Sequence, residues 1–229
     1  MLGQIGSFTV PVLFDKKTLS IVNNESSEII RIFNTAFNHL LPEDKAAIDI
    51  YPEVLRKEID ESNEWVYNTI NSELVPFLFS LGPYTDRGRL DGVYRTGFAL
   101  KQGAYETAFN ELFTSLDRID STLAAQHTAQ SNFLIGNRLT EADIRLYTTI
   151  VRFDPVYYGH FKCNARTIRD GYPHIHKWLR NLYWNYPAFK DTTNFEHIKV
   201  HYHWSHTHIN PSRIVPLGPV PNIRPLDGQ

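Results

Sequence analysis

The stretch Gly136-Asn137-Arg138-Leu139-Thr140-Glu141-Ala142-Asp143-Ile144 decides the fold of this chain. Thr140 and Asp143 stand three residues apart at the start of a segment with helical apolar spacing. In that arrangement the Thr140 hydroxyl can accept a hydrogen bond from the Asp143 N–H, while the Asp143 carboxylate accepts one from the Thr140 N–H. The pattern predicts a buried, capped helix beginning at Thr140, and Asp154-Pro155 predicts where it bends or ends.

Helical periodicity extends from this box in both directions. Upstream, Pro52 opens a predicted helix that passes through Ile70, and apolar residues then recur at helical spacing from about 94 to 123. Downstream, helices are predicted from Pro173 and over about 192–204. The Pro- and Gly-rich stretch after Asn210 is expected to be extended. From residue 50 onward the sequence is therefore predicted to be almost entirely helical.

The N-terminal stretch has a different pattern. Alternating apolar residues over 8–14 and the pair Ile21-Val22 flank the turn Asp15-Lys16-Lys17, which predicts two short strands. Residues 25–41 then have helical spacing. Two strands and a helix followed only by helices predict a small α/β fragment joined to an α-helical domain.

Composition narrows the class of protein. The chain has 229 residues, 42% of them hydrophobic, a net charge of −2 and a pI of about 6.5. This charge balance does not indicate a nucleic-acid-binding protein, which usually has a basic surface. No apolar run approaches the roughly 18 residues of a membrane span, and the first residues lack the features of a secretory signal. The single cysteine, Cys163, fits a reducing compartment, and a cytoplasmic location is predicted.

Two pairs of residues predict a peptide-binding site at the N-terminal end. A cis-proline at Val10-Pro11 would leave the Val10 N–H and C=O free to pair with the backbone of a peptide such as glutathione. The alternative for an isolated Val-Pro is an ordinary strand-edge proline. Glu25 and Ser26 precede a strong helix, where the Ser26 hydroxyl and the first free N–H groups can bind a γ-glutamyl carboxylate. The alternative there is a simple N-terminal cap, but the combined spacing favours glutathione.

Longer motifs resemble one family, the glutathione transferases, and within it the omega-like Xi class, the glutathionyl-hydroquinone reductases. The resemblance covers about residues 8–71 and 92–219. It is carried by Gly92-Val93-Tyr94-Arg95-Thr96-Gly97-Phe98-Ala99, Asp143-Ile144-Arg145-Leu146, Arg152-Phe153-Asp154-Pro155-Val156-Tyr157, His160-Phe161-Lys162-Cys163-Asn164, Asn194-Phe195-Glu196-His197-Ile198, His201-Tyr202, His208-Ile209-Asn210-Pro211 and Leu217-Gly218-Pro219.

The resemblance implies a mainly α fold with three parts. A partial thioredoxin-like β-β-α remnant would occupy 1–42 and bind glutathione, the C-terminal all-helical domain of glutathione transferases would occupy 43–219, and 220–229 would be a tail. Residues 72–91 interrupt the family pattern with two prolines and two glycines, so we expect a poorly packed insertion there. The chain also resembles a family member that lacks its N-terminal segment.

The family reaction implies both site residues and a difficulty. A cysteine thiolate reduces a glutathionyl-hydroquinone to the hydroquinone with glutathione as co-substrate, and three family tyrosines that face the hydroquinone match Tyr94, Tyr157 and Tyr202. The family's nucleophile lies in Cys-Pro-Trp-Ala, which does not occur here, and Cys163 matches a helical-domain cysteine instead. Because this nucleophile is absent, we expect weak or no reductase activity; the alternative is a non-catalytic interaction module. The resemblance also implies a homodimer.

The histidines near the C-terminus raise the question of a metal site. His197 and His201 are four residues apart on one predicted helix, as zinc ligands often are. No third ligand stands in a clear pattern beyond Glu196. The sequence therefore predicts a solvated or hydrogen-bonded histidine cluster and no metal.

Overall fold

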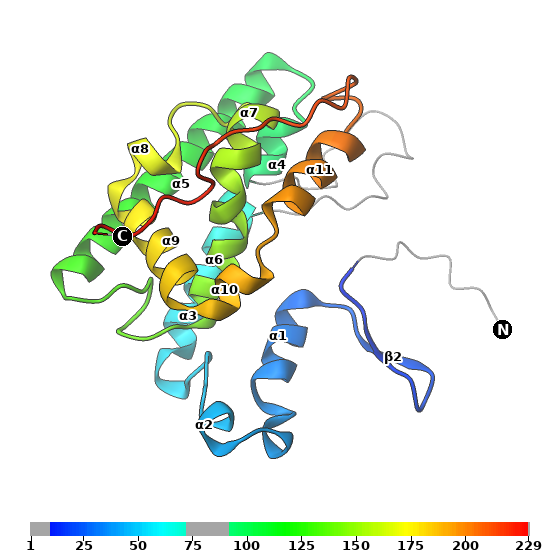
Figure 1. Cartoon of the computed structure of the whole chain (residues 1–229), viewed down its shortest axis with the longest axis vertical. Helices are drawn as coiled ribbons and strands as arrows, with labels where there is room; N and C mark the ends of the chain where they lie inside the picture. The colour runs from blue at the N-terminus through cyan, green and yellow to red at the C-terminus, as the bar shows by residue number, and fades with distance from the viewer. Residues whose placement is uncertain (1–9, 72–91, 229) are drawn as a thin grey trace.

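The computed structural model describes residues 10–71 and 92–228, which form a β-hairpin followed by a large helical body (Figure 1). Strands β1 (Leu13–Asp15) and β2 (Ser20–Asn23) pair antiparallel, with Leu13 opposite Asn23 and Asp15 opposite Ser20. The Asp15 carboxylate accepts from the Lys17 N–H at 2.7 Å and closes the turn, as short polar side chains often do.

Helices make up nearly all of the remainder. In chain order they are α1 (Ser26–Thr35), η1 (Asn38–Leu40), α2 (Glu43–Ala46), η2 (Glu53–Leu55), α3 (Arg56–Val66), η3 (Tyr67–Asn71), α4 (Gly92–Gly97), α5 (Gln102–Thr128), α6 (Glu141–Arg152), η5 (Phe153–Tyr157), α7 (Tyr158–His160), α8 (Ile168–Gly171), α9 (Pro173–Asn185), α10 (Pro187–Thr192) and α11 (Phe195–Ser205). This arrangement confirms the predicted mainly α fold with a small β-β-α start.

The core lies where α3, α4, α5, α6 and α9 pack together. Its largest fully buried side chain, Trp178 of α9, donates from Nε1 to the Asp143 carboxylate at 2.9 Å. Asp143 thereby ties the start of α6 to the middle of α9. The rest of the core is aliphatic and aromatic, including Ile59, Ile70, Leu112, Leu116, Ile119, Leu123, Leu146, Ile150, Phe153 and Phe161.

An ion-pair network joins α1 to the helical body. The Arg31 guanidinium reaches the Glu141 carboxylate at 2.9 Å and Asp60 at 2.5 Å, and it stacks on the Tyr51 ring at 3.9 Å. Glu141 is fully buried and also accepts from Asn63 at 3.0 Å. Because an unpaired buried carboxylate is costly, these donors make Arg31 a fixed link between the two parts of the chain.

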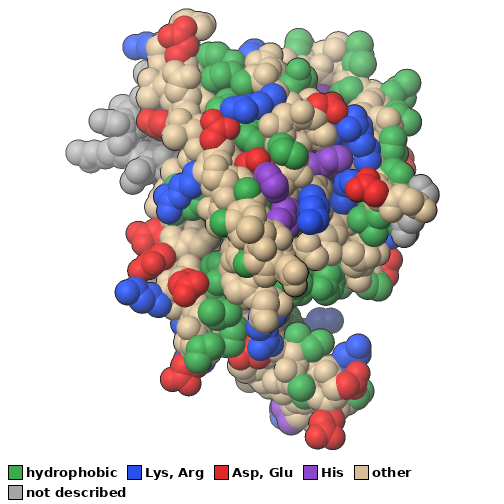
Figure 2. Space-filling model, turned by 90° about the vertical axis from the view of Figure 1, so that its left-hand side faces the viewer, with side chains coloured by type: hydrophobic (Ala, Val, Ile, Leu, Met, Phe, Trp, Pro, Cys, Tyr) green, Lys and Arg blue, Asp and Glu red, His purple; other side chains and the backbone are tan. Residues whose placement is uncertain are grey.

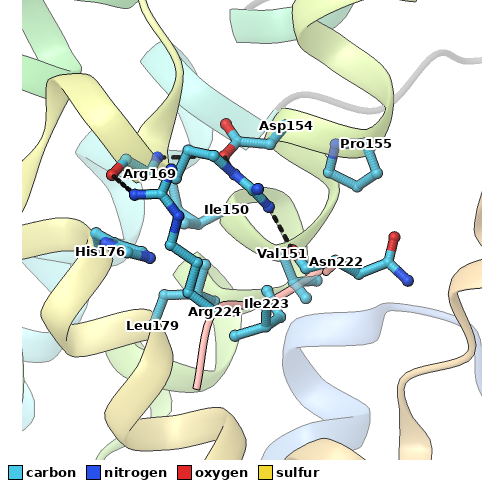
Figure 3. Close-up of a pocket in the computed structure, with 10 residues that line it drawn as sticks. All are labelled: Ile150, Val151, Asp154, Pro155, Arg169, His176, Leu179, Asn222, Ile223 and Arg224. Carbon is cyan, nitrogen blue, oxygen red and sulfur yellow. Dashed lines mark hydrogen bonds and ion pairs between the residues drawn. The ribbon is translucent and has the colours of Figure 1, made fainter. Parts of the chain in front are cut away.

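The segment after α11 runs back across the helical body towards α8 and α9 (Figure 1). Arg169 lies between the Asp154 carboxylate, at 3.3 Å, and the carbonyl of Asn222, at 2.9 Å (Figure 3). Ile223 is buried beside them. Residues 220–228, which the sequence predicts to be a tail, are therefore extended but held against the helices.

Acidic and basic side chains alternate on the face that carries this segment. Figure 2 shows Lys and Arg interspersed with Asp and Glu, with several histidines near the centre. Ion pairs account for part of the pattern, since Arg180 binds Asp227 and Arg224 binds Asp170, each at 2.8 Å.

Two of the predicted helices are shorter than expected. The continuous helix over about 94–123 is wrong: α4 ends at Gly97 and α5 begins at Gln102. A Cβ at position 97 would overlap the Phe161 ring, so this glycine allows the close contact that ends α4. The helix over 25–41 ends at Thr35; beyond it, the Asn38 side chain donates to the Ala46 carbonyl, and the Asn34 side chain donates to Asp49. The expectation for 72–91 lies outside the described residues.

Among the helices of residues 10–71 and 92–228, none combines the length and apolar character needed to cross a membrane.

Candidate active site

Three tyrosine hydroxyls form a hydrogen-bonded chain. The Tyr202 oxygen lies 2.7 Å from that of Tyr94 and 2.9 Å from that of Tyr157. These residues are 94, 157 and 202 in a sequence that contains 12 tyrosines. The fold thus brings together the three tyrosines that the family resemblance singles out, with Tyr202 in the middle.

Each of these tyrosines comes from a different element. Tyr94 lies on α4, Tyr157 ends η5 and Tyr202 lies on α11. Pro155 has no N–H to continue the α-helical ladder, and the chain passes it by widening into the π-helical turn of η5. The α-helix α6 thus ends at Arg152, close to where Asp154-Pro155 predicts, and the widened turn that follows carries Tyr157.

Aromatic packing fixes the rings of the three tyrosines. The Tyr157 ring stacks on Phe161 with centroids 5.4 Å apart, and Tyr94 lies 5.0 Å from the same Phe161 ring. Tyr202 meets Tyr157 edge to face at 5.5 Å. Contacts of this kind favour particular ring orientations, so the three hydroxyls are held in place by their own side chains.

Burial gives the hydroxyl chain a direction. Tyr157 and Tyr202 are buried, whereas Tyr94 is half-buried. Among the described residues, the hydrogen bond to Tyr202 is the only one that the Tyr157 hydroxyl makes. A buried O–H seeks an acceptor, so Tyr157 donates to Tyr202. Either hydroxyl can donate in the Tyr202–Tyr94 pair, and Tyr94 is the least buried of the three.

The buried end of the chain stays protonated. Burial raises the pKa of Tyr157 well above its ordinary value, and the neighbouring Tyr202 and Tyr94 add to that effect. A neutral phenol donates a hydrogen bond, whereas a phenolate can only accept. Tyr157 is therefore a neutral hydrogen-bond donor at the buried end of the chain.

A pair of histidines lies next to the tyrosines, and no pattern in the sequence singles it out. His160 Nε2 lies 3.1 Å from His206 Nδ1, and His206 meets the Tyr202 ring edge-on at 5.6 Å. Burial lowers the pKa of His160 to about 3 and that of His206 to about 4. The pair is therefore neutral at pH 7, and it joins the end of α7 to the end of α11.

Cys163 is placed as a core residue. Its thiol is fully buried and lies 3.8 Å from the carbonyl of Phe161 and 4.0 Å from that of Val93, with the Thr96 side chain as a further hydrogen-bond partner. Burial raises the pKa of the Cys163 thiol far above its usual range. A thiol in this environment is not a nucleophile, because the reactive form is the thiolate.

The residues predicted to bind glutathione lie on the hairpin and at the start of α1. The Val10-Pro11 peptide bond is cis, and both residues are exposed. Glu25 is the N-cap of α1, where its carboxylate accepts from the N–H of Ser27 at 3.3 Å. Ser26, the first residue of the helix, is exposed. The four residues thus lie on elements separate from those that carry the tyrosines.

The capping box at α6 is present and is more extensive than the sequence indicates. The Asp143 carboxylate accepts from the Thr140 N–H at 3.0 Å, the Thr140 hydroxyl at 3.2 Å and the Leu134 N–H at 2.8 Å, besides Trp178. Burial is the largest influence on its pKa, which is raised despite these donors. Thr140 and Asp143 therefore form a structural centre.

The described part of the chain has no group of three or more His, Cys, Asp or Glu side chains arranged to hold a metal ion. His201 is exposed and its ring faces that of Tyr202 at 5.2 Å.

Comparison with known proteins shows the family of this chain. Residues 102–181 match the family described as "Glutathione S-transferase, C-terminal domain". The crystal structure of glutathione transferase Xi 1 from Trametes versicolor superposes with a TM-score of 0.83 and is 61% identical, over 96% of this chain and 68% of that one. The chain belongs to the Xi-class glutathione transferase family.

Two further members of the family connect it to glutathione. "Glutathione S-transferase omega-like 2" of Schizosaccharomyces pombe is 52% identical over 94% of this chain and 62% of its own length. "Glutathionyl-hydroquinone reductase YqjG" of Escherichia coli is 46% identical over 93% of this chain and 56% of its own length. The glutathione-bound structure of YqjG superposes with a TM-score of 0.78 and 45% identity, over 95% of this chain and 61% of that one. The chain thus spans less than two thirds of these two relatives.

Proposed function

We propose that this chain carries the hydroquinone-binding half of a glutathionyl-hydroquinone reductase, with glutathione as co-substrate. The observation that carries the proposal is the hydroxyl chain Tyr157–Tyr202–Tyr94, with O···O distances of 2.9 and 2.7 Å. Three hydrogen-bonded phenols, of which Tyr94 is the least buried, suit a ligand that is itself a phenol and that must gain a proton at ring carbon. The name of the Escherichia coli relative supports this substrate class.

The proposed reaction balances as follows. A protein thiolate attacks the sulfur of the glutathionyl-hydroquinone, and the bond from sulfur to ring carbon breaks with its electron pair on carbon. Tyr94 donates a proton to that carbon and regains one from solvent, while Tyr202 and Tyr157 stay protonated and hold the Tyr94 hydroxyl in place. The hydroquinone leaves, and a second glutathione attacks the mixed disulfide to give oxidised glutathione and restore the thiolate.

Glutathione itself is proposed to bind at the hairpin and α1. The exposed Val10 backbone next to the cis-Pro11 would pair with the peptide, and Ser26 with the α1 N-terminus would hold the γ-glutamyl carboxylate. Glu25 is proposed to accept from the γ-glutamyl ammonium. Because its carboxylate bonds the Ser27 N–H at 3.3 Å, that contact would be shared between helix and ligand.

The proposed reaction needs a reactive cysteine thiol, which this chain does not provide. The only cysteine of the sequence is Cys163, which is buried with a raised pKa. We therefore propose that this chain releases hydroquinone slowly or not at all when it acts alone. In the cell we propose a cytoplasmic homodimer. The alternative, a non-catalytic interaction module, is favoured by the buried thiol and would not require glutathione affinity.

Calorimetric titration with 2-(glutathion-S-yl)hydroquinone tests the ligand assignment without requiring turnover. We expect the wild-type chain and a Tyr183→Phe control to bind equally, because Tyr183 packs on Trp184 and Phe195 away from the three tyrosines. Tyr94→Phe should weaken binding about tenfold, the loss of a hydrogen bond to the ligand of about 1.4 kcal/mol. Equal affinity of all three proteins would refute the assignment.

Turnover separates the reductase from a protein that only binds. Hydroquinone release in excess glutathione should be close to the uncatalysed rate for the wild-type chain and for Cys163→Ser. Rapid release that disappears in Cys163→Ser would show that the buried thiol reacts after all, and would overturn the proposed role of Cys163.

A further inference from the structure

A concave site lies beside α7, and none of the three tyrosines lines it. It is a groove of about 590 Å³ between the η5–α7 segment and the stretch 209–218. Pro155, Val156, Ile209, Ile214 and Pro216 form an apolar lining. Its volume is within the usual 300–1,000 Å³ of small-molecule sites.

Two buried basic side chains approach this groove from α11. His203, which lines it, is 6% exposed, and its Nε2 has no hydrogen-bond partner among the described residues. Lys199 lies one helical turn earlier, is 7% exposed, and donates from Nζ to the Leu217 carbonyl at 2.8 Å. Leu217 stands between Pro216 and Gly218, both of which line the groove.

These bases have no acidic partner within the described part of the chain. Lys199 makes no ion pair there, although a buried ammonium is costly unless it is paired. The acidic residue of the lining, Asp154, is already committed, because its carboxylate accepts from the N–H groups of Ile168 at 2.7 Å and Arg169 at 3.2 Å and from the Arg169 side chain.

A third base stands at the mouth of the groove. Lys162 is exposed, and its backbone is fixed by a hydrogen bond from the Tyr105 hydroxyl to its carbonyl, at 3.0 Å. The rings of Tyr158 and His160 flank it in the lining. The groove therefore combines apolar walls and aromatic rings with an excess of positive charge and with a His203 ring nitrogen that has no hydrogen-bond partner among the described residues.

We propose that this groove is a binding site for a small aromatic carboxylate. The ring lies against Pro155, Ile209 and Ile214. The carboxylate takes the N–H of His203 and the ammonium of Lys162, and its negative charge compensates Lys199 beside it. The site goes beyond the proposed reductase function, since it uses neither the tyrosines nor the glutathione-binding residues.

The test is calorimetric titration of the full chain with 1-naphthoate, against the neutral 1-naphthalenemethanol and the cationic 1-naphthylmethylammonium. We expect 1-naphthoate to bind at least tenfold more tightly than either. Lys162→Gln should reduce its affinity at least fivefold, and Lys177→Gln, a matched exposed lysine on α9, should leave it unchanged. Lys162 is exposed, so its replacement does not endanger folding.

Methyl NMR of isoleucine places the ligand. The resonances of Ile209 and Ile214 should shift with 1-naphthoate, whereas Tyr202→Phe should leave the affinity unchanged. Equal binding of the three naphthalenes, an affinity that Lys162→Gln does not alter, or binding lost in Tyr202→Phe would each overturn the proposal. Because the titration contains no glutathione, its failure would not bear on the reductase assignment.

Discussion

Tyr202→Phe is expected to destabilise the protein because it removes the middle of the hydroxyl chain. The substitution keeps the ring and its packing but deletes both O···O contacts, at 2.7 and 2.9 Å. The Tyr157 hydroxyl, 3% exposed, then has no acceptor among the described residues. Leaving a buried donor unpaired costs about 1–3 kcal/mol beyond the lost bonds, so we expect a loss of about 2–3 kcal/mol.

The assay is thermal and urea unfolding of Tyr202→Phe beside wild type. For a chain of this size the expected loss corresponds to a fall in Tm of roughly 5–10 °C. Tyr183→Phe is the matched control, since it removes a hydroxyl that is not part of the Tyr157–Tyr202–Tyr94 hydrogen-bonded chain and should change stability by less than about 0.5 kcal/mol.

A double-mutant cycle isolates the cause. Tyr157→Phe combined with Tyr202→Phe removes the orphaned donor together with its acceptor, so the double variant should cost less than the sum of the two single variants. Costs that add to within about 0.3–0.5 kcal/mol, or a Tyr202→Phe protein as stable as wild type, would refute the hydroxyl chain.

Three further predictions concern the helical body. Asp143→Ala should lower stability by at least about 3 kcal/mol in urea unfolding, because it orphans three buried N–H donors, whereas exposed Asp44→Ala should change little. Burial lowers the pKa of His127, His176 and His206 to about 4 and that of His160 to about 3. The unfolded chain therefore binds protons that the folded chain does not, and the urea midpoint should decrease as the pH is lowered from 6.5 to 5; an unchanged midpoint would contradict this. Cys163 should resist a thiol reagent in the native state and react fully in urea; rapid native labelling would show that the thiol is accessible.

Local pattern was sufficient to predict most of the helices. The Thr140–Asp143 box and the spacing of apolar residues depend on neighbours within one or two turns, and α6, α9 and α11 begin close to where the sequence places them. The break between α4 and α5 was not predictable in the same way. It depends on Gly97 meeting Phe161, 64 positions later, and no local pattern encodes that contact.

The candidate site was likewise predictable in part from the sequence. Family motifs selected Tyr94, Tyr157 and Tyr202 from the tyrosines of the chain, but the order of their hydrogen bonds depends on burial, which the sequence does not express. The histidine pair His160–His206 joins positions 46 residues apart and was missed for that reason. The basic lining around Lys199 and His203 was missed likewise, because the lack of an acidic partner in the described chain is a property of the fold.

The most direct test of the account is NMR of the chain labelled with ¹³C at the tyrosine Cζ, titrated with 2-(glutathion-S-yl)hydroquinone. The Cζ resonance reports hydrogen bonding at each phenol. We expect the signals of Tyr94, Tyr202 and Tyr157 to shift together, with the largest change at Tyr94, while that of Tyr183 stays fixed. Saturable binding that leaves the three signals unmoved would contradict the claim that these tyrosines form the hydroquinone site.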